Sequence, residues 1–148
     1  MAYWIFKVNP EQYRIDERLA DPEVRITWQV SKYRDQIRTG DTAFIWRTGR
    51  NRGLCAVMKI ISDPIDMPEI KSEEPYCIVL DVSTKCRVFG ELVERFPLIK
   101  AEDIKSIPGL QGLSVFHGFQ QATNFPVTEE EGRILGRLVA TGHRSLAI

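Results

Sequence analysis

Trp28 and Trp46 are the residues of this chain that are best suited to stacking on a flat ligand. Trp28 lies between the polar residues Thr27 and Gln29, whereas Trp46 lies in the apolar run 42–47. A buried tryptophan packs into the core, but a tryptophan at a polar junction can present its ring to a ligand. The pattern leaves both roles open for Trp28, and it favours core packing for Trp46 because both faces of its segment are apolar.

Three side-chain amides lie near these aromatic residues or near a predicted chain turn: Asn9, Gln29 and Gln120. An amide offers both hydrogen-bond donors and an acceptor, which suits the recognition of a base edge. Asn9 precedes Pro10 and is equally well suited to cap a helix. A helix cap and a ligand contact are compatible for Asn9, whereas exposed glutamines are common and give a weaker signal.

Arginines are concentrated in the polar loop 48–53 and directly before it, at Arg47, Arg50 and Arg52. Further cations lie nearby in the sequence at Lys32, Arg34 and Arg38, although the chain as a whole has 20 basic and 20 acidic side chains. A protein that coats nucleic acid through its phosphates is usually strongly basic. The loop is therefore either a local phosphate contact or an ordinary solvated surface.

Common catalytic and metal-binding motifs are missing from the sequence. It has no glycine-rich dinucleotide or nucleotide loop, no zinc-protease motif and no serine-hydrolase elbow. His117 and His143 have no neighbouring ligand pairs, so we expect no metal site and no cofactor. Catalysis by scattered residues remains an alternative.

The chain also has the features of a cytoplasmic protein without a membrane partner. Its three cysteines, Cys55, Cys77 and Cys86, form no C-x-x-C pair and predict reduced thiols. We find no apolar run long enough to span a bilayer and no signal peptide. These features predict a cytoplasmic location.

The apolar pattern predicts short strands separated by loops and short helices. We expect strands at 3–8, 24–30, 42–47, 54–62, 76–82 continuing to 89, 114–119 and 124–127. We expect helices or helical turns at 10–20, 31–37, 91–96 and 101–106, and a longer helix from Thr128 to Gly142.

These elements predict one α+β domain over residues 1–148. The strands are short and the helices are irregular, which does not fit a regular alternation of strands and helices. We expect a curved sheet or β-barrel of about six strands, flanked by short helices.

The order of these features resembles the EVE domain family, which is PUA-like and similar to YTH domains. The resemblance is carried by the runs YWIFKVNP at 3–10, GD at 40–41 and LCAVMKI at 54–60, together with Trp28. It continues in FHGFQQ at 116–121 and PVTEEE at 126–131. It implies a PUA-like fold and binding of a modified base that is flipped out of DNA or RNA.

The resemblance also implies roles for individual residues. Trp28 falls on the position of an aromatic cage wall and Asn9 on that of a base-edge contact, with Trp46 and Phe116 as further cage candidates. Two alternatives remain open: an enzyme acting on a modified nucleoside, and an interaction module whose tryptophans are all core.

Overall fold

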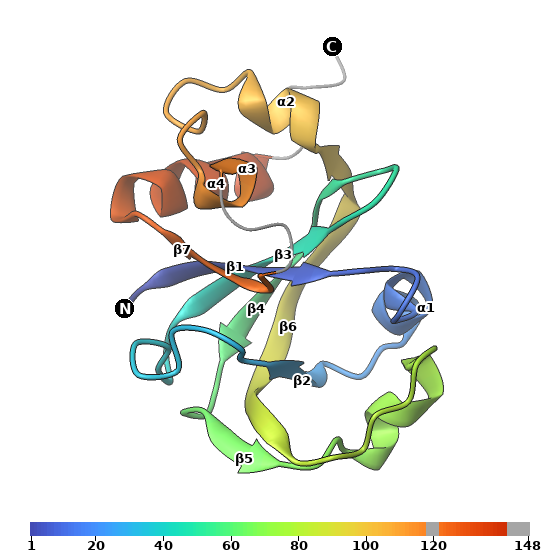
Figure 1. Cartoon of the computed structure of the whole chain (residues 1–148). Helices are drawn as coiled ribbons and strands as arrows, with labels where there is room; N and C mark the ends of the chain where they lie inside the picture. Colours follow the sequence, from blue (N-terminus) through green and yellow to red (C-terminus); the bar gives the residue numbers. More distant parts are fainter. Residues whose placement is uncertain (118–121, 142–148) are drawn as a thin grey trace.

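The computed structural model describes residues 1–117 and 122–141 (Figure 1). Seven strands form one mixed sheet, and short helices lie against it. The elements are β1 (Tyr3–Val8), α1 (Ile15–Ala20), β2 (Arg25–Gln29), β3 (Thr42–Arg47), β4 (Gly53–Ile60), β5 (Ile65–Met67), the 3-10 helix η1 (Lys71–Tyr76), β6 (Lys85–Lys100), α2 (Ala101–Lys105), α3 (Ser114–His117), β7 (Asn124–Val127) and α4 (Glu129–Thr141).

The sheet is strongly curved but open. Its strand order is β2-β6-β4-β3-β1-β7, with β5 also paired to β6. The outermost strands β2 and β7 are joined through the side chain of Asn124, whose Oδ1 accepts the N–H of Ser31 at 2.9 Å and whose Nδ2 donates to the Gln29 carbonyl at 3.3 Å. The prediction of a curved sheet is confirmed, and the alternative of a closed barrel is wrong.

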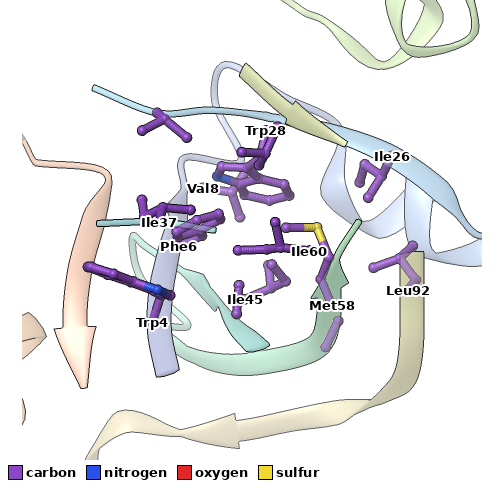
Figure 2. Close-up of a cluster of buried hydrophobic side chains, with 14 of the residues drawn as sticks. Trp4, Phe6, Val8, Ile26, Trp28, Ile37, Ile45, Met58, Ile60 and Leu92 are labelled. Carbon is purple, nitrogen blue, oxygen red and sulfur yellow. The ribbon is translucent and has the colours of Figure 1, made fainter. Parts of the chain in front are cut away.

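Alternation along the strands creates two hydrophobic cores, one on each face of the sheet. Side chains one residue apart in a strand point to opposite faces. We call the core that contains Trp4, Phe6 and Trp28 the inner core. The core that contains Ile5, Phe44 and Trp46 is the outer core. Figure 2 shows the inner core with Trp28 among its side chains. Helices α2, α3 and α4 cover the outer face.

Helix α4 confirms the strongest local prediction. Thr128 and Glu131 form a reciprocal capping box, with the Thr128 N–H donating to Glu131 Oε1 and the Glu131 N–H donating to Thr128 Oγ1. Gly132 lets the helix approach β1 closely, because a Cβ at this position would lie 2.3 Å from the ring of Tyr3.

The N-terminal half departs from the predicted helices at two places. The helix expected at 10–20 starts only at Ile15, because the Asn9 carbonyl accepts the N–H groups of Gln12 and Tyr13 in a tight turn. The segment 31–37 forms a single turn that begins at Tyr33. The hydroxyl of Ser31 is not its cap, because it is hydrogen-bonded to Thr123 and Asn124.

Three further predictions in the second half are wrong. Residues 76–82 are not a strand, since Tyr76 is the last residue of η1 and 77–82 follow it as an irregular segment. Residues 91–96 belong to the 16-residue strand β6, which accommodates Pro97 at a register shift opposite Cys55 where no N–H is needed for the ladder. Residues 114–117 form α3 instead of a strand.

Candidate functional site

A cavity of about 780 Å³ lies where β1 and β3 end and along the free edge of β2. Its lining comes from both faces of the sheet, since it includes both Lys7 and Val8 from β1 and both Thr27 and Trp28 from β2. The aromatic and polar residues of the lining include Asn9, Gln12, Tyr13, Thr27, Trp28, Gln29, Trp46, Arg52, Glu69, Glu73, Arg87, Lys105 and Phe116. Five of the six predicted pocket residues are thus brought to one cavity. The sixth, Gln120, lies outside the described residues.

Trp28 is both a core residue and a cavity residue. Its ring packs 6.3 Å from the ring of Phe6 in the inner core, and the residue is 9% exposed. Because it is also part of the cavity lining, the small exposed part of this residue borders the cavity. Trp28 is therefore packed in the core and also borders the cavity.

Trp46 lies on the other face of the sheet. It belongs to the outer core and packs edge-on against Phe116, with ring centroids 5.5 Å apart. The ammonium group of Lys105 lies 4.9 Å from the centroid of the Phe116 ring. Trp28 and Trp46 therefore border the cavity from opposite faces of the sheet, and we call these two sides the Trp28 end and the Trp46 end.

The amides differ in how much of their hydrogen-bonding capacity is used. Asn9 Oδ1 accepts the N–H of Glu11 at 2.9 Å, so the side chain closes a local turn. Its Nδ2 group has no acceptor among residues 1–117 and 122–141, which leaves two donors for a ligand. Gln29 is exposed at the cavity, and its backbone carbonyl accepts a hydrogen bond from Asn124.

A buried polar cluster forms the flank of the cavity next to Tyr13. Glu73 accepts hydrogen bonds from the hydroxyl of Tyr13 at 2.6 Å and from Arg18 Nε at 2.8 Å. Burial raises the pKa of the Glu73 carboxyl, while the bonds from Tyr13 and Arg18 act in the opposite direction. The pKa of Tyr13 is also raised, mainly by burial and by the neighbouring Glu73 carboxylate. Tyr13 is therefore a neutral hydrogen-bond donor.

A second polar cluster lies along β2. The Thr27 hydroxyl donates to Glu69 Oε1 at 2.5 Å, and Arg87 Nη1 donates to Glu69 Oε2 at 3.2 Å. Sequence reasoning missed Glu69, Glu73 and Arg87. Glu69 lies in the loop before η1 and Glu73 lies in η1, in an acidic stretch that gives no local sign of a role, and both reach the cavity through long-range contacts.

The three predicted phosphate contacts lie in different places. Arg52 borders the cavity, whereas Arg50 is exposed outside its lining. Arg47 forms an ion pair with Asp16, with Nη1 at 2.6 Å from Oδ2, and borders a second groove of about 690 Å³. Lys7 and Lys105, which the sequence did not single out as cavity cations, join Arg52 in the lining.

Within 1–117 and 122–141, no group of histidine, cysteine and acidic side chains is placed to hold a metal ion. None of the helices in these ranges is both long enough and apolar enough to cross a bilayer.

The family model of the EVE domain matches residues 2–138. The chain belongs to the EVE domain family. The PUA-like α+β architecture expected from the resemblance is thereby confirmed. No protein with a curated description matches this EVE domain by sequence.

Solved structures share the fold of this EVE domain at low sequence identity. A Leishmania major protein is 18% identical, with a TM-score of 0.68 and coverage of 95% of this chain and 96% of that chain. A Rhodopseudomonas palustris protein is 17% identical, with a TM-score of 0.66 and coverage of 95% and 94%. Human THYN1, solved in complex with DNA containing 5-methylcytosine, is 18% identical, with a TM-score of 0.65 and coverage of 91% and 95%.

Proposed function

We propose that this EVE domain binds a modified base in DNA or RNA, held in the cavity beside Trp28, and that it does so without chemical conversion of the base. The observation that carries the proposal is the position of Trp28, which borders a polar-rimmed cavity of about 780 Å³. This volume lies within the range of small-molecule sites. The family match and the complex of THYN1 with 5-methylcytosine DNA support the same class of ligand.

The lining residues take different roles in this proposal. Trp28 contacts the face or edge of the base, and the free amide donors of Asn9, together with Gln29, contact its polar edge. Trp46 and Phe116 border the opposite end and contact a neighbouring part of the strand. Gln120 remains a predicted base contact.

Binding energies require phosphate contacts in addition to the base. Stacking of one base on aromatic side chains contributes about 1–3 kcal/mol, and burial of a methyl group adds about 0.8 kcal/mol. Flipping a base out of a duplex costs a few kcal/mol. We propose that Arg52 and Lys105 supply backbone contacts at the cavity, and that Arg47 and Arg50 extend them. Oligonucleotides should therefore bind more tightly than free nucleosides.

The location of the protein is part of the proposal. Cys55, Cys77 and Cys86 carry free thiols, which supports the reducing cytoplasmic environment predicted from the sequence.

The decisive experiment is a titration with matched oligonucleotides that carry 5-methylcytosine, 5-hydroxymethylcytosine, N6-methyladenine or the unmodified bases. We expect one modified oligonucleotide to bind more tightly than its unmodified partner. Trp28→Phe should reduce this preference, because a smaller ring gives less contact with the base. Trp4→Phe is the matched control, since Trp4 is buried in the same core but lies outside the cavity lining.

Two results would contradict the proposal. The first is equal binding of all modified and unmodified oligonucleotides. The second is an unchanged preference in a folded Trp28→Phe variant.

A further inference from the structure

We propose that Glu69 and Arg87 make the cavity selective for a base with an exocyclic amino group beside a ring-nitrogen acceptor, the arrangement found in cytosine and adenine. The inference rests on the proposed function, because it assigns the ligand class of the same cavity. It adds a selection rule for the polar edge of the base, independent of the recognition of its modification.

The Glu69 carboxylate does not use all of its hydrogen-bond acceptor positions. Its Oε1 accepts the Thr27 hydroxyl at 2.5 Å and the N–H of Ile70 at 3.0 Å, while Oε2 accepts only Arg87 Nη1 among residues 1–117 and 122–141. A carboxylate offers about four lone-pair directions. One direction on Oε2 therefore remains for a ligand donor.

The Arg87 guanidinium does not use all of its hydrogen-bond donors. It donates from Nε to the Met67 carbonyl at 3.3 Å, from Nη1 to Glu69 at 3.2 Å and from Nη2 to the Ser83 carbonyl at 3.5 Å. These are long contacts, and a guanidinium has five N–H groups. Two N–H groups are thus left without an acceptor in the described part of the chain.

The strand register places Arg87 opposite Gln29, the residue after Trp28, and both members of the pair line the same cavity as Trp28. Gln29 is paired with Arg87 across β2 and β6, and Trp28 is paired with Val88. The Thr27 hydroxyl, one residue before Trp28, holds Glu69. Thr27 and Trp28 point to opposite faces of the edge strand β2, and both border the cavity. A base at this edge can therefore meet the Trp28 ring and the Glu69–Arg87 pair.

Glu69 and Arg87 are too buried to be an ordinary surface ion pair. The side chain of Arg87 is 6% exposed and that of Glu69 is 11% exposed. Removing two charges from water is costly, and an apolar pair could hold two strands together equally well. Ligand pockets hold a small number of placed polar or charged groups that fix the orientation of the ligand.

For a base held in one orientation in the cavity, the pair complements an exocyclic amino donor beside a ring-nitrogen acceptor. Cytosine carries an amino donor beside the N3 acceptor, and adenine carries an amino donor beside N1, so a carboxylate and a guanidinium complement both. Thymine presents a carbonyl oxygen and an N3–H group at the same positions. These groups would face the carboxylate and the guanidinium with matching polarity, which disfavours thymine.

The experiment compares 5-methylcytosine with thymine in otherwise identical duplexes, each opposite guanine. The two bases carry the same 5-methyl group and differ at position 4 and in the proton on N3. The T·G mismatch opens more easily than the 5-methylcytosine·G pair, so the flipping cost favours thymine. We nevertheless expect 5-methylcytosine to bind about tenfold more tightly or better.

If the initial titration selects a modified adenine, the corresponding probes are N6-methyladenine and 6-methoxypurine. This pair keeps the methyl group and the N1 acceptor and exchanges only the N–H donor for oxygen. We again expect the amino compound to bind about tenfold more tightly or better.

Glu69→Gln tests the residue, because an amide can turn either its donor or its acceptor toward the base. We expect the ratio between the amino and oxygen probes to fall toward one, while preference for the methylated over the unmethylated base persists. Glu91→Gln is the control, since it removes the same charge at an exposed position of β6 outside the cavity lining. If Glu69→Gln fails to fold, Thr27→Val removes the hydroxyl that holds Glu69 and should lower the ratio less strongly.

The outcomes separate this inference from the proposed function. Equal binding of the two probes by the unaltered protein overturns the inference alone, provided that modified and unmodified bases are still distinguished. A Glu69→Gln variant that weakens both probes by the same factor also overturns it, since this is the effect of a purely structural residue. Absence of any preference for modified bases overturns the proposed function itself.

Discussion

The two ends of the cavity use tryptophan in different ways. At one end, Trp28 comes from an edge strand, packs on Phe6 and has the Thr27–Glu69–Arg87 cluster beside it. At the other end, Trp46 comes from a central strand and is closed off by Phe116. The first end offers hydrogen-bonding groups in fixed positions, whereas the second offers aromatic surface and the cation of Lys105.

This difference follows from the position of each strand in the sheet. An edge strand leaves one side open, so polar groups next to Trp28 can reach a ligand. A central strand is covered on both sides, so the neighbours of Trp46 are used in packing. We therefore expect base selectivity at the Trp28 end and general strand contact at the Trp46 end.

The largest expected effect comes from truncating Trp46. Trp46→Ala should lower the free energy of unfolding by about 3–5 kcal/mol, because the residue is only 3% exposed. Denaturant titration measures this loss. The milder Trp46→Phe should keep the preference for a modified base, in contrast to Trp28→Phe. If Trp46→Phe removes the preference and Trp28→Phe does not, the assignment of the two ends is reversed.

An intermediate loss of stability is expected from Asn124→Ala, which removes the side chain that joins the end of β2 to β7. Loss of the Asn124 amide leaves the N–H of Ser31 and the carbonyl of Gln29 without their partner. We expect a loss of about 1–3 kcal/mol in unfolding free energy. Faster hydrogen exchange at Ser31 should show that the end of β2 has loosened.

The matched control for Asn124→Ala is Thr123→Val. It removes a hydroxyl that contacts Ser31 and donates to Asn124 Oδ1 at 3.2 Å, but it keeps the bonds of the Asn124 amide to the Ser31 N–H and the Gln29 carbonyl. The explanation fails if this control loosens β2 as much as Asn124→Ala does.

The smallest expected effects are on nucleic-acid affinity, and they distinguish Arg52 from Arg47. Arg52→Ala should weaken binding of modified and unmodified duplexes equally, and it should reduce the salt slope of log K by about 0.9 for one lost phosphate contact. Arg47→Ala should change the slope less, because Asp16 already neutralises Arg47. Affinities measured at several salt concentrations test both statements. A larger slope change for Arg47→Ala would place the nucleic-acid backbone over the second groove.

Much of the fold was predictable where the signal was local. The apolar strands at 3–8 and 42–47 agree with β1 and β3, and the capping box of Thr128 and Glu131 fixed the start of α4. The strand expected at 76–82 was wrong. Its apolar side chains give the pattern of a strand, but the chain there is held by turns and by hydrogen bonds from Ile78 and Val79 to the Gln12 carbonyl.

The cavity was only partly predictable from the sequence, because some of its residues meet only through long-range contacts. Trp28 and Asn9 were found through the resemblance, and the structure brings both to one cavity. Their neighbour Glu69 was not found, because it is 42 residues from Thr27 in the chain and meets it only through the packing of the segment after β5. No local pattern encodes such a contact.

The sequence by itself determined the family, the α+β class and the main strands, and it predicted a pocket role for Trp28. These depend on residue order, apolar periodicity and capping, which are properties of neighbouring residues. The tertiary structure decided that Trp28 and Trp46 lie on opposite faces of the sheet and that Glu69 and Arg87 border the same cavity as Trp28. Strand order and long-range packing set these positions, because they determine which side chains meet once the sheet has curved.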